Sequence, residues 1–191
     1  MPSTPTPPTA PTHIDLARAI ADACVLRGTF TLRSGRTSSF YIDKYLFSTK
    51  PAVLEPLGKL FAARIAAIGA ANPGGVHRLA GAELGGIPLV TVASLATGLP
   101  SIFIRNAKKD YGTAKRTEGT LNNGDNVVFV EDVATTGGQA LEAVAELQSL
   151  GANVLAVIAT IDRQEGAREN IEKTGVRFEA LFTKADLGIT A

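Results

Sequence analysis

Apolar and polar residues recur with two different periods along the chain, and the change of period divides it into two parts. Residues 14–27 and 54–68 carry apolar side chains three or four positions apart, which predicts two helices. Between them, residues 30–43 alternate and are interrupted at Gly35, which is typical of a hairpin or of a strand with a loop. The first part of the chain therefore predicts helices around a small β-element.

From about residue 76 the pattern changes to short, nearly continuous apolar runs separated by helical stretches. Such runs predict an α/β fold, a parallel doubly wound sheet with helices on both faces. We place this core at approximately residues 76–165 and a small amino-terminal hood at approximately residues 13–70. Ligands of such sheets bind beyond the carboxyl ends of the strands. The expected strands contain RLAGA, SIFIR, VVFV and VLAVIATI, and the expected helices span residues 87–96 and 140–150.

The first twelve residues have a composition that does not suit a packed core. MPSTPTPPTAPT holds five prolines, four threonines and no charged residue. We therefore expect residues 1–12 to form a disordered tail and residues 13–191 to form a single domain of ordinary size. The tail also lacks the basic and long apolar regions of a secretion signal.

Charge and cysteine content narrow the possible functions. Charged residues make up 19% of the chain and the formal net charge is +1, so neither nucleic acid nor a membrane surface is expected as a partner. The single cysteine, Cys24, cannot form an internal disulfide, which fits a cytoplasmic protein. The long uncharged stretch of residues 85–104 contains Pro88, Gly98 and Pro100, and it indicates a helix, a turn and a strand rather than a membrane span.

The sequence VVFVEDVATTGGQ, residues 127–139, combines an apolar strand, two carboxylates and a loop of small residues. The loop glycines allow the backbone to approach a ligand, and the free amides and hydroxyls of a helix start favour an anion such as phosphate. Carboxylates would repel phosphate but accept hydrogen bonds from sugar hydroxyls, so a phosphorylated sugar is the simplest ligand. The alternative is that the acids are only solvated at a strand end. Neither a P-loop lysine nor G-x-G-x-x-G is present.

This stretch resembles the signature of the type I phosphoribosyltransferases, which bind 5-phosphoribosyl 1-diphosphate. The resemblance implies that Glu131 and Asp132 hold the ribose hydroxyls and take part in catalysis. It also implies that the loop holds the 5-phosphate. The loop residues that it assigns are Val133, Ala134, Thr135, Thr136, Gly137, Gly138 and Gln139.

Further motifs resemble those of orotate phosphoribosyltransferases. They are FTLRSGRTSSFYID, RNAKKDYGTAKRTEG, TIDRQEGA and, at the carboxyl end, FTKADLGI. The resemblance implies transfer of the phosphoribosyl group to orotate, which yields orotidine 5-phosphate and pyrophosphate in pyrimidine (UMP) biosynthesis. It also implies Mg²⁺ as the cofactor. Since Mg²⁺ prefers pyrophosphate and ribose oxygens with water to a protein cage, no residue is assigned as a metal ligand.

Orotate is a flat anion, and two kinds of side chain suit it. Arg163 follows an expected strand end and could receive the carboxylate, whereas Tyr41 and Ile42 could form an apolar wall for the ring. Thr135 is placed to touch both the phosphate loop and the base. The alternatives are an internal ion pair of Arg163 with Asp162 or Glu165, and a core position for Phe40 or Ile42.

Residues 105–119 form a basic segment that, by the same resemblance, closes over pyrophosphate. Cations there would stabilise the charge that builds on the leaving group, and closure would exclude water. The resemblance also implies a homodimer in which this loop reaches the neighbouring site. The alternative is a solvated charge run. The residues assigned to the diphosphate are Arg33, Arg105, Lys108, Lys109 and Tyr111, with Lys109 also catalytic.

The chain departs from the common family pattern at several positions. Asn106, Tyr111 and Arg33 stand where many members have lysine, histidine and lysine, and Leu84 and Gly85 replace a Tyr-Lys pair. Residues 81–88 would then contact pyrophosphate through backbone amides. The rival functions are a type I phosphoribosyltransferase for a purine or uracil, and a regulator with this fold that binds nucleic acid. A regulator should carry a DNA-binding segment or a broad basic face, and the sequence shows neither.

Overall fold

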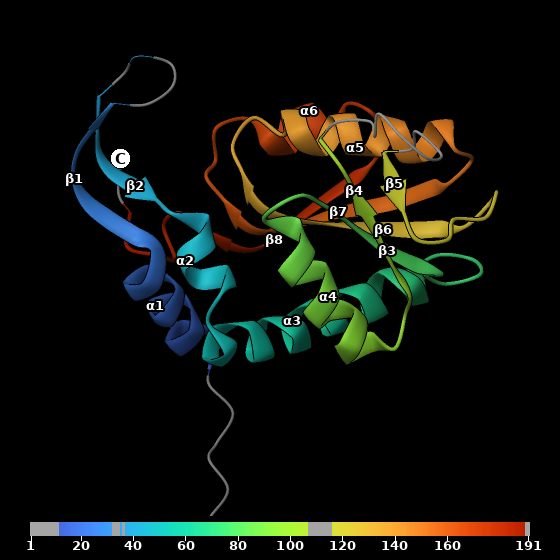
Figure 1. Ribbon diagram of the computed structural model, residues 1–191, viewed down its shortest axis with the longest axis horizontal. Coiled ribbons are helices and arrows are strands. Elements are labelled where there is room, and N and C mark those ends of the chain that lie inside the picture. Colours follow the sequence, from blue (N-terminus) through green and yellow to red (C-terminus); the bar gives the residue numbers. More distant parts are fainter. Residues whose placement is uncertain (1–11, 32–34, 36, 107–115, 190–191) are drawn as a thin grey trace, which may run out of the picture.

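A computed structural model describes residues 12–31, 35, 37–106 and 116–189 of the chain (Figure 1). The helices are α1 (His13–Cys24), α2 (Lys44–Ser48), α3 (Pro51–Ala71), α4 (Gly86–Thr97), α5 (Gly138–Ser149) and α6 (Ala167–Glu172). The strands are β1 (Val25–Thr31), β2 (Thr37–Ile42), β3 (Arg78–Ala82), β4 (Ser101–Ile104), β5 (Thr117–Glu118), β6 (Asn126–Ala134), β7 (Asn153–Asp162) and β8 (Arg177–Thr183).

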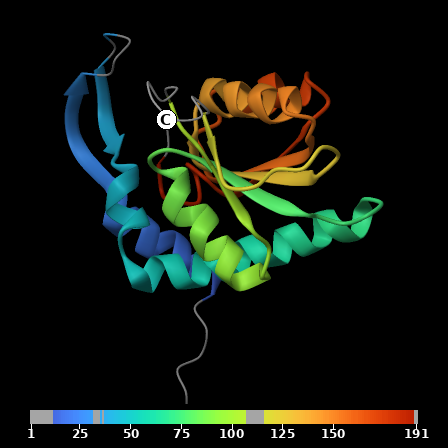
Figure 2. The ribbon, with the colours of Figure 1, turned by 45° about the vertical axis from the view of Figure 1, so that its right-hand side comes forward.

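The central sheet has the strand order β5-β4-β3-β6-β7-β8, and all its neighbouring strands are parallel except the antiparallel pair β4 and β5. Helices α3 and α4 cover one face, and α5 and α6 cover the other (Figures 1 and 2). The predicted doubly wound α/β fold is confirmed.

Strand β6 shows why a continuous apolar run predicts a strand of the central sheet. Val128 and Val130 pack into the core cluster that contains the buried residues of α3 and α4. Val127 and Phe129 pack into the second cluster, with α5 and α6. Because successive side chains of a strand point to opposite faces, a strand covered on both sides must be apolar at every position.

The amino-terminal part differs from the predicted boundaries. Thr12, counted with the tail, caps α1 by accepting a hydrogen bond from the Asp15 N–H, while Asp15 accepts one from the Thr12 N–H. The helix ends at Cys24 rather than at residue 27, because Val25 begins the strand that pairs antiparallel with β2. This β1–β2 hairpin stands beside the sheet (Figure 1).

Two further elements, one helix and one strand, belong to the core domain although the sequence pattern did not place them there. Helix α3 was assigned to the hood, but its buried residues, among them Phe61 and Ile65, join the core under the sheet. Strand β8 lies beyond the expected end of the core at residue 165, and it pairs with β7 from Ala156 to Asp162. The sheet therefore extends to Thr183.

Helix α4 accounts for the uncharged stretch at residues 85–104. It has 12 residues and ends at Gly98, which adopts a left-handed conformation with φ of 74°. Strand β4 follows at Ser101. In the described part of the chain no helix combines the length and the apolar character needed to cross a membrane.

Candidate active site

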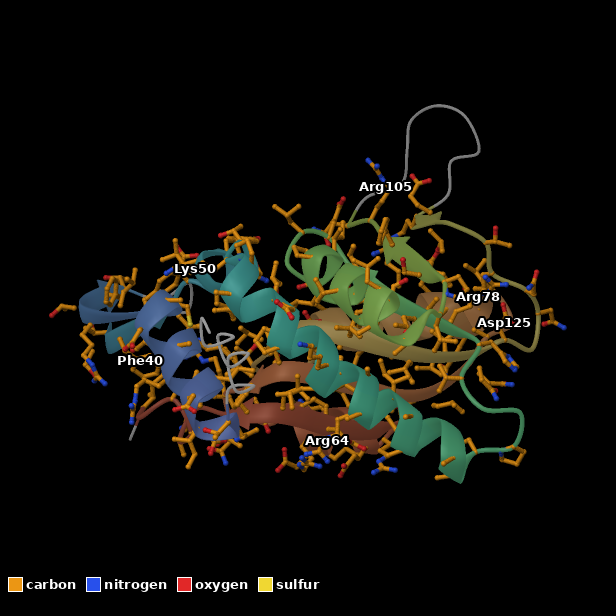
Figure 3. All side chains as sticks on the ribbon, turned by 90° about the horizontal axis from the view of Figure 1, so that it is seen from below. Phe40, Lys50, Arg64, Arg78, Arg105 and Asp125 are labelled. Atoms are coloured by element: carbon orange, nitrogen blue, oxygen red, sulfur yellow. The ribbon has the colours of Figure 1, made fainter. Side chains whose placement is uncertain are left out.

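The segments that follow β3, β4, β6 and β7 meet at the carboxyl edge of the sheet, and the β1–β2 hairpin and α2 approach them there. Phe40 on the hairpin and the contact between Arg78 and Asp125 lie at opposite ends of the molecule (Figure 3). Since Arg78 opens β3 and Asp125 precedes β6, that pair marks the amino edge. The predicted residues that the structure describes gather at the other edge, as expected for a parallel sheet.

Glu131 and Asp132 lie inside β6 rather than past its end. The strand continues to Ala134, and the two acids are only 4% and 1% exposed. Asp132 Oδ1 accepts a hydrogen bond of 2.5 Å from the Val133 N–H, and Glu131 Oε1 accepts one of 3.1 Å from the Asp132 N–H. The interpretation of the pair as merely solvated is therefore wrong, because buried carboxylates need partners or a function.

Lys44, the first residue of α2, supplies a partner that was not predicted. Its Nζ lies 2.9 Å from Asp132 Oδ2. Burial lowers the pKa of the Lys44 ammonium, but the neighbouring Asp132 and Glu131 raise it by more, so the pKa lies above its ordinary value. No sequence signal marked this contact, since the two residues are far apart in the chain and lysine is common in helices.

The environment of Glu131 favours its neutral form. Burial and the adjacent Asp132 raise the pKa of Glu131 to about 8, although Lys44 lowers it in part. Two carboxylates side by side in a low dielectric cannot both ionise easily. At neutral pH the raised pKa of Glu131 therefore favours a proton on this carboxyl in the ligand-free protein.

This proton makes stability depend on pH. The unfolded chain releases it near the ordinary value of 4.5 and the folded chain near 8, so stability falls as pH rises between these values. Glu131→Gln removes the loss, and its gain in Tm over the parent should therefore grow between about pH 5 and about pH 9. Thermal denaturation at several pH values checks this, with Glu142→Gln on the exposed face of α5 as the control. A gain that does not change with pH would contradict the assignment.

The loop between β6 and α5 has the geometry of an anion site. Gly137 caps α5 in a left-handed conformation with φ of 80°, and no side chain caps the helix. The left-handed backbone favours glycine here, and a Cβ on Gly137 would also crowd Ile171 Cδ1 at 3.1 Å. The first amides of α5 therefore remain open to a ligand, with exposed Thr136 and Gly138 beside them.

Gln139 connects the phosphate loop to two neighbouring segments. Its Nε2 donates to the Glu83 carbonyl at 3.1 Å and to Asn106 Oδ1 at 3.4 Å. Glu83 Oε1 in turn accepts from the Asn106 N–H at 2.6 Å. The Gln139 side chain thus ties the loops together, and only its backbone amide remains for the predicted contact with phosphate.

The backbone groups of Val133 and Ala134, which were assigned to the phosphate loop, make contacts within the protein. The Val133 side chain packs against the core and Ala134 is buried. The Ala134 carbonyl accepts a hydrogen bond of 2.9 Å from the Arg163 N–H. This bond brings the segment after β7 against the start of the phosphate loop, where Thr135 is half-buried.

The segment between β3 and α4 lies against Asp132. A Cβ on Gly85 would fall 1.6 Å from Asp132 Oδ2, so this carboxylate orientation requires glycine at position 85. The peptide bond between Glu83 and Leu84 is cis, and the Leu84 side chain is exposed. This segment offers backbone groups at the predicted pyrophosphate position.

Arg163 and the hairpin form the predicted base side of the site. The guanidinium Cζ lies 5.6 Å from the centroid of the Phe40 ring, and Nη2 lies 2.8 Å from Glu165 Oε1. The internal ion pair kept as the alternative is thus present. Tyr41 is 46% exposed, whereas Ile42 is buried in the core, so Tyr41 is the accessible member of the predicted apolar wall.

The basic segment enters and leaves the described structure beside this edge. The Arg105 N–H donates to the Arg116 carbonyl at 2.8 Å, and Arg105 Nη1 lies 3.8 Å from Glu118 Oε1. Arg105 follows β4 and is labelled in Figure 3. Arg33, Lys108, Lys109 and Tyr111 lie outside the described residues.

The described part of the chain offers neither a group of metal ligands nor a reactive thiol. There, no three His, Cys, Asp or Glu side chains group so that they could hold a metal ion. Burial, and to a lesser extent Asp43, raises the pKa of the Cys24 thiol to about 12, so it is a packed side chain rather than a nucleophile.

A buried acid pair, an uncapped helix start and a doubly wound sheet that presents both at its carboxyl edge place the molecule among the type I phosphoribosyltransferases. The chain is 45% identical over 181 residues to the orotate phosphoribosyltransferase of Haloquadratum walsbyi, and the match covers 94% of each chain. The chain belongs to the orotate phosphoribosyltransferase family. No protein-family model matches it.

Solved structures agree with this assignment. Mycobacterium tuberculosis orotate phosphoribosyltransferase in complex with Fe(III) dicitrate is similar, with a TM-score of 0.82, 31% identity, and coverage of 94% of this chain and 100% of that one. The same enzyme in complex with 5-phospho-alpha-D-ribosyl 1-diphosphate has a TM-score of 0.78 at the same identity and coverage.

Proposed function

We propose that the protein transfers the 5-phosphoribosyl group from 5-phosphoribosyl 1-diphosphate to orotate. The products are orotidine 5-phosphate and pyrophosphate, and the reaction serves pyrimidine (UMP) biosynthesis. The observation that carries the proposal is the meeting of two half-sites at one sheet edge. Glu131, Asp132 and the start of α5 suit ribose 5-phosphate, and Arg163 beside Phe40 and Tyr41 suits a flat anionic base.

The chemistry assigns a task to each half-site. The expected transition state has oxocarbenium character at the ribose carbon, as in glycoside chemistry. Asp132 accepts hydrogen bonds from ribose hydroxyls, and its negative charge favours the positive charge that develops on the sugar. The first amides of α5 hold the 5-phosphate, so the sugar is fixed at both ends while pyrophosphate departs.

We assign Mg²⁺ to the diphosphate rather than to a protein cage. Diphosphate and ribose oxygens are the hard ligands that this ion prefers, and the ion would neutralise charge on the leaving group. This assignment fits a site whose described residues offer no cluster of three metal ligands.

We also propose a cytoplasmic homodimer in which the loop of residues 105–119 serves the neighbouring site. The resemblance supports the shared loop. An exposed apolar groove between α3 and α4 supports a second copy of the chain, since it contains Leu95, which is 81% exposed, together with Pro51, Leu54 and Val92.

The activity is tested directly with purified protein, 5-phosphoribosyl 1-diphosphate, Mg²⁺ and one base at a time. Orotate should be consumed only when the diphosphate and Mg²⁺ are both present, because the diphosphate supplies the transferred group and the ion neutralises charge on the leaving group. Orotate should be the preferred base because Arg163 offers a guanidinium to its carboxylate. Uracil lacks that carboxylate and is the matched control. Turnover of uracil or hypoxanthine in place of orotate would sink the assignment.

A further inference from the structure

We propose that Lys44 is a positioning residue of the site: its ammonium compensates the buried charge of Asp132 and holds the Asp132 carboxylate where the ribose hydroxyls bind. This inference rests on the proposed function and extends it to a residue of the amino-terminal part. Its basis is the distance of 2.9 Å between Lys44 Nζ and Asp132 Oδ2.

The two oxygens of Asp132 have different surroundings. Oδ1 accepts the Val133 N–H within the strand. Oδ2 lies between the Lys44 ammonium and Gly85, in space that a Cβ at position 85 would fill. The hydrogen bond to Oδ1 leaves the carboxylate little freedom to turn. The contact with the Lys44 ammonium fixes the remaining oxygen, Oδ2, as well. That oxygen is the acceptor left for a sugar hydroxyl.

Burial makes this ammonium necessary. Asp132 is 1% exposed, and a carboxylate taken out of water needs a compensating charge. The charged groups described against Asp132 are Glu131 on the same strand and Lys44 from α2, while the segment between β3 and α4 presents Gly85 without a side chain. Lys44 is therefore the cation that allows the pair to keep a negative charge.

The Lys44 side chain also has room to adjust to a ligand. It is 31% exposed, so one side of the ammonium contacts the carboxylate while part of the side chain reaches solvent. An ammonium has three donors, and the ion pair with Asp132 can occupy one of them. The other two remain for water or for oxygens of the bound sugar.

The position of Lys44 connects the base side of the site to the ribose side. Asp43 accepts the Tyr45 N–H at 3.2 Å, which caps α2, and the Asp43 N–H donates to the Cys24 carbonyl at 2.9 Å. Tyr41, on the base side, lies three residues before Lys44. The ion pair with Asp132 thus fixes this short segment of the hood to the ribose-holding strand.

The test compares Lys44→Met and Lys44→Arg with the unaltered protein. Titration calorimetry with 5-phosphoribosyl 1-diphosphate and Mg²⁺ measures binding, and orotate turnover is measured in parallel. Lys44→Met should weaken diphosphate binding by about 10- to 100-fold, because it leaves a buried carboxylate without its partner. Lys44→Arg keeps the charge and should recover most of the affinity. Lys50→Met is the control, since Lys50 is an exposed neighbour at the start of α3 (Figure 3).

A pH series separates positioning from a general loss of structure. Because Glu131 adjoins the ribose-holding Asp132, diphosphate affinity should show an inflection where Glu131 loses its proton, near pH 8 in the unaltered protein. Lys44 lowers the pKa of Glu131, so Lys44→Met should move this inflection to higher pH. Lys44→Arg should leave it in place. Unchanged affinity in Lys44→Met, or a loss that arginine does not rescue and that leaves the inflection unmoved, would overturn the proposal.

The two proposals fail in different ways. Diphosphate binding does not depend on the base, so it reports on Lys44 even for a protein that uses another base. If the unaltered protein binds the diphosphate and ignores orotate, the orotate assignment fails and the Lys44 test still decides. If orotate is consumed equally well by Lys44→Met and the unaltered protein, the role of Lys44 fails alone.

Discussion

Replacing Asp132 by Asn should reduce kcat/KM for 5-phosphoribosyl 1-diphosphate by about 10²- to 10³-fold, the range seen when one preorganised electrostatic contact is removed from a transition state. The substitution keeps the shape of the side chain. Asn can still accept the Val133 N–H, but it offers no negative charge to ribose hydroxyls or to the developing oxocarbenium ion.

The loss should fall mainly on kcat if the charge matters most in the transition state. Interactions made only there lower kcat and kcat/KM together, whereas uniform binding would raise KM alone. Steady-state kinetics with varied diphosphate measures both quantities. Asp22→Asn serves as the control, since Asp22 is exposed on α1. A kcat/KM within about threefold of the parent would contradict the ribose-holding role of Asp132.

Folding should be affected less than activity. The substitution leaves the Lys44 ammonium without its carboxylate, but that side chain is partly exposed and can turn to water. The strand itself remains packed, because Val128 and Val130 hold it in the core. Thermal denaturation should therefore show that Asp132→Asn is folded, with a change in Tm that is too small to account for its loss of turnover.

The sheet could be predicted from sequence because its signal is local. Strands buried on both faces must be apolar throughout, and VVFV and VLAVIATI satisfy this within themselves. Strand β1 could not be separated from α1 in the same way. Val25 continues the helical spacing of α1, and only its pairing with Ile42, 17 residues on, assigns it to a strand.

The site was predictable where one motif carries several groups and not where distant segments meet. Residues 127–139 hold both acids and the anion loop, so the ribose 5-phosphate half was readable from one stretch. The depth of the acids was not, because it depends on β7 and on the segment at Gly85 packing around them. The Lys44 contact and the Gln139 link to Glu83 were missed for the same reason: each joins residues that are far apart in the sequence and belong to different elements or segments.

Replacing Lys109 by Ala should slow turnover by about 10²- to 10³-fold, because an ammonium that stabilises charge on departing pyrophosphate acts mainly in the transition state. Lys109 lies outside the described residues, but Asn106 is fixed at the site edge by the side chains of Glu83 and Gln139. In the sequence, Lys109 follows Asn106 by three residues. Turnover is measured at saturating orotate. Lys173→Ala, exposed at the end of α6, should change neither rate nor Tm.

Combining this variant with Asp132→Asn decides which chain the loop serves. In a mixed dimer with a shared loop, the Lys109→Ala chain keeps Asp132 and receives an intact loop from its neighbour, so one of the two sites is complete. Such dimers, co-produced with two different tags and purified through both, should have about half the parent activity. If each loop serves its own chain, both sites lack one group and the mixed dimer stays as slow as either variant. Recovery would therefore require both the homodimer and the crossing of the loop, whereas no recovery would leave Lys109 in the mechanism and return the loop to its own site.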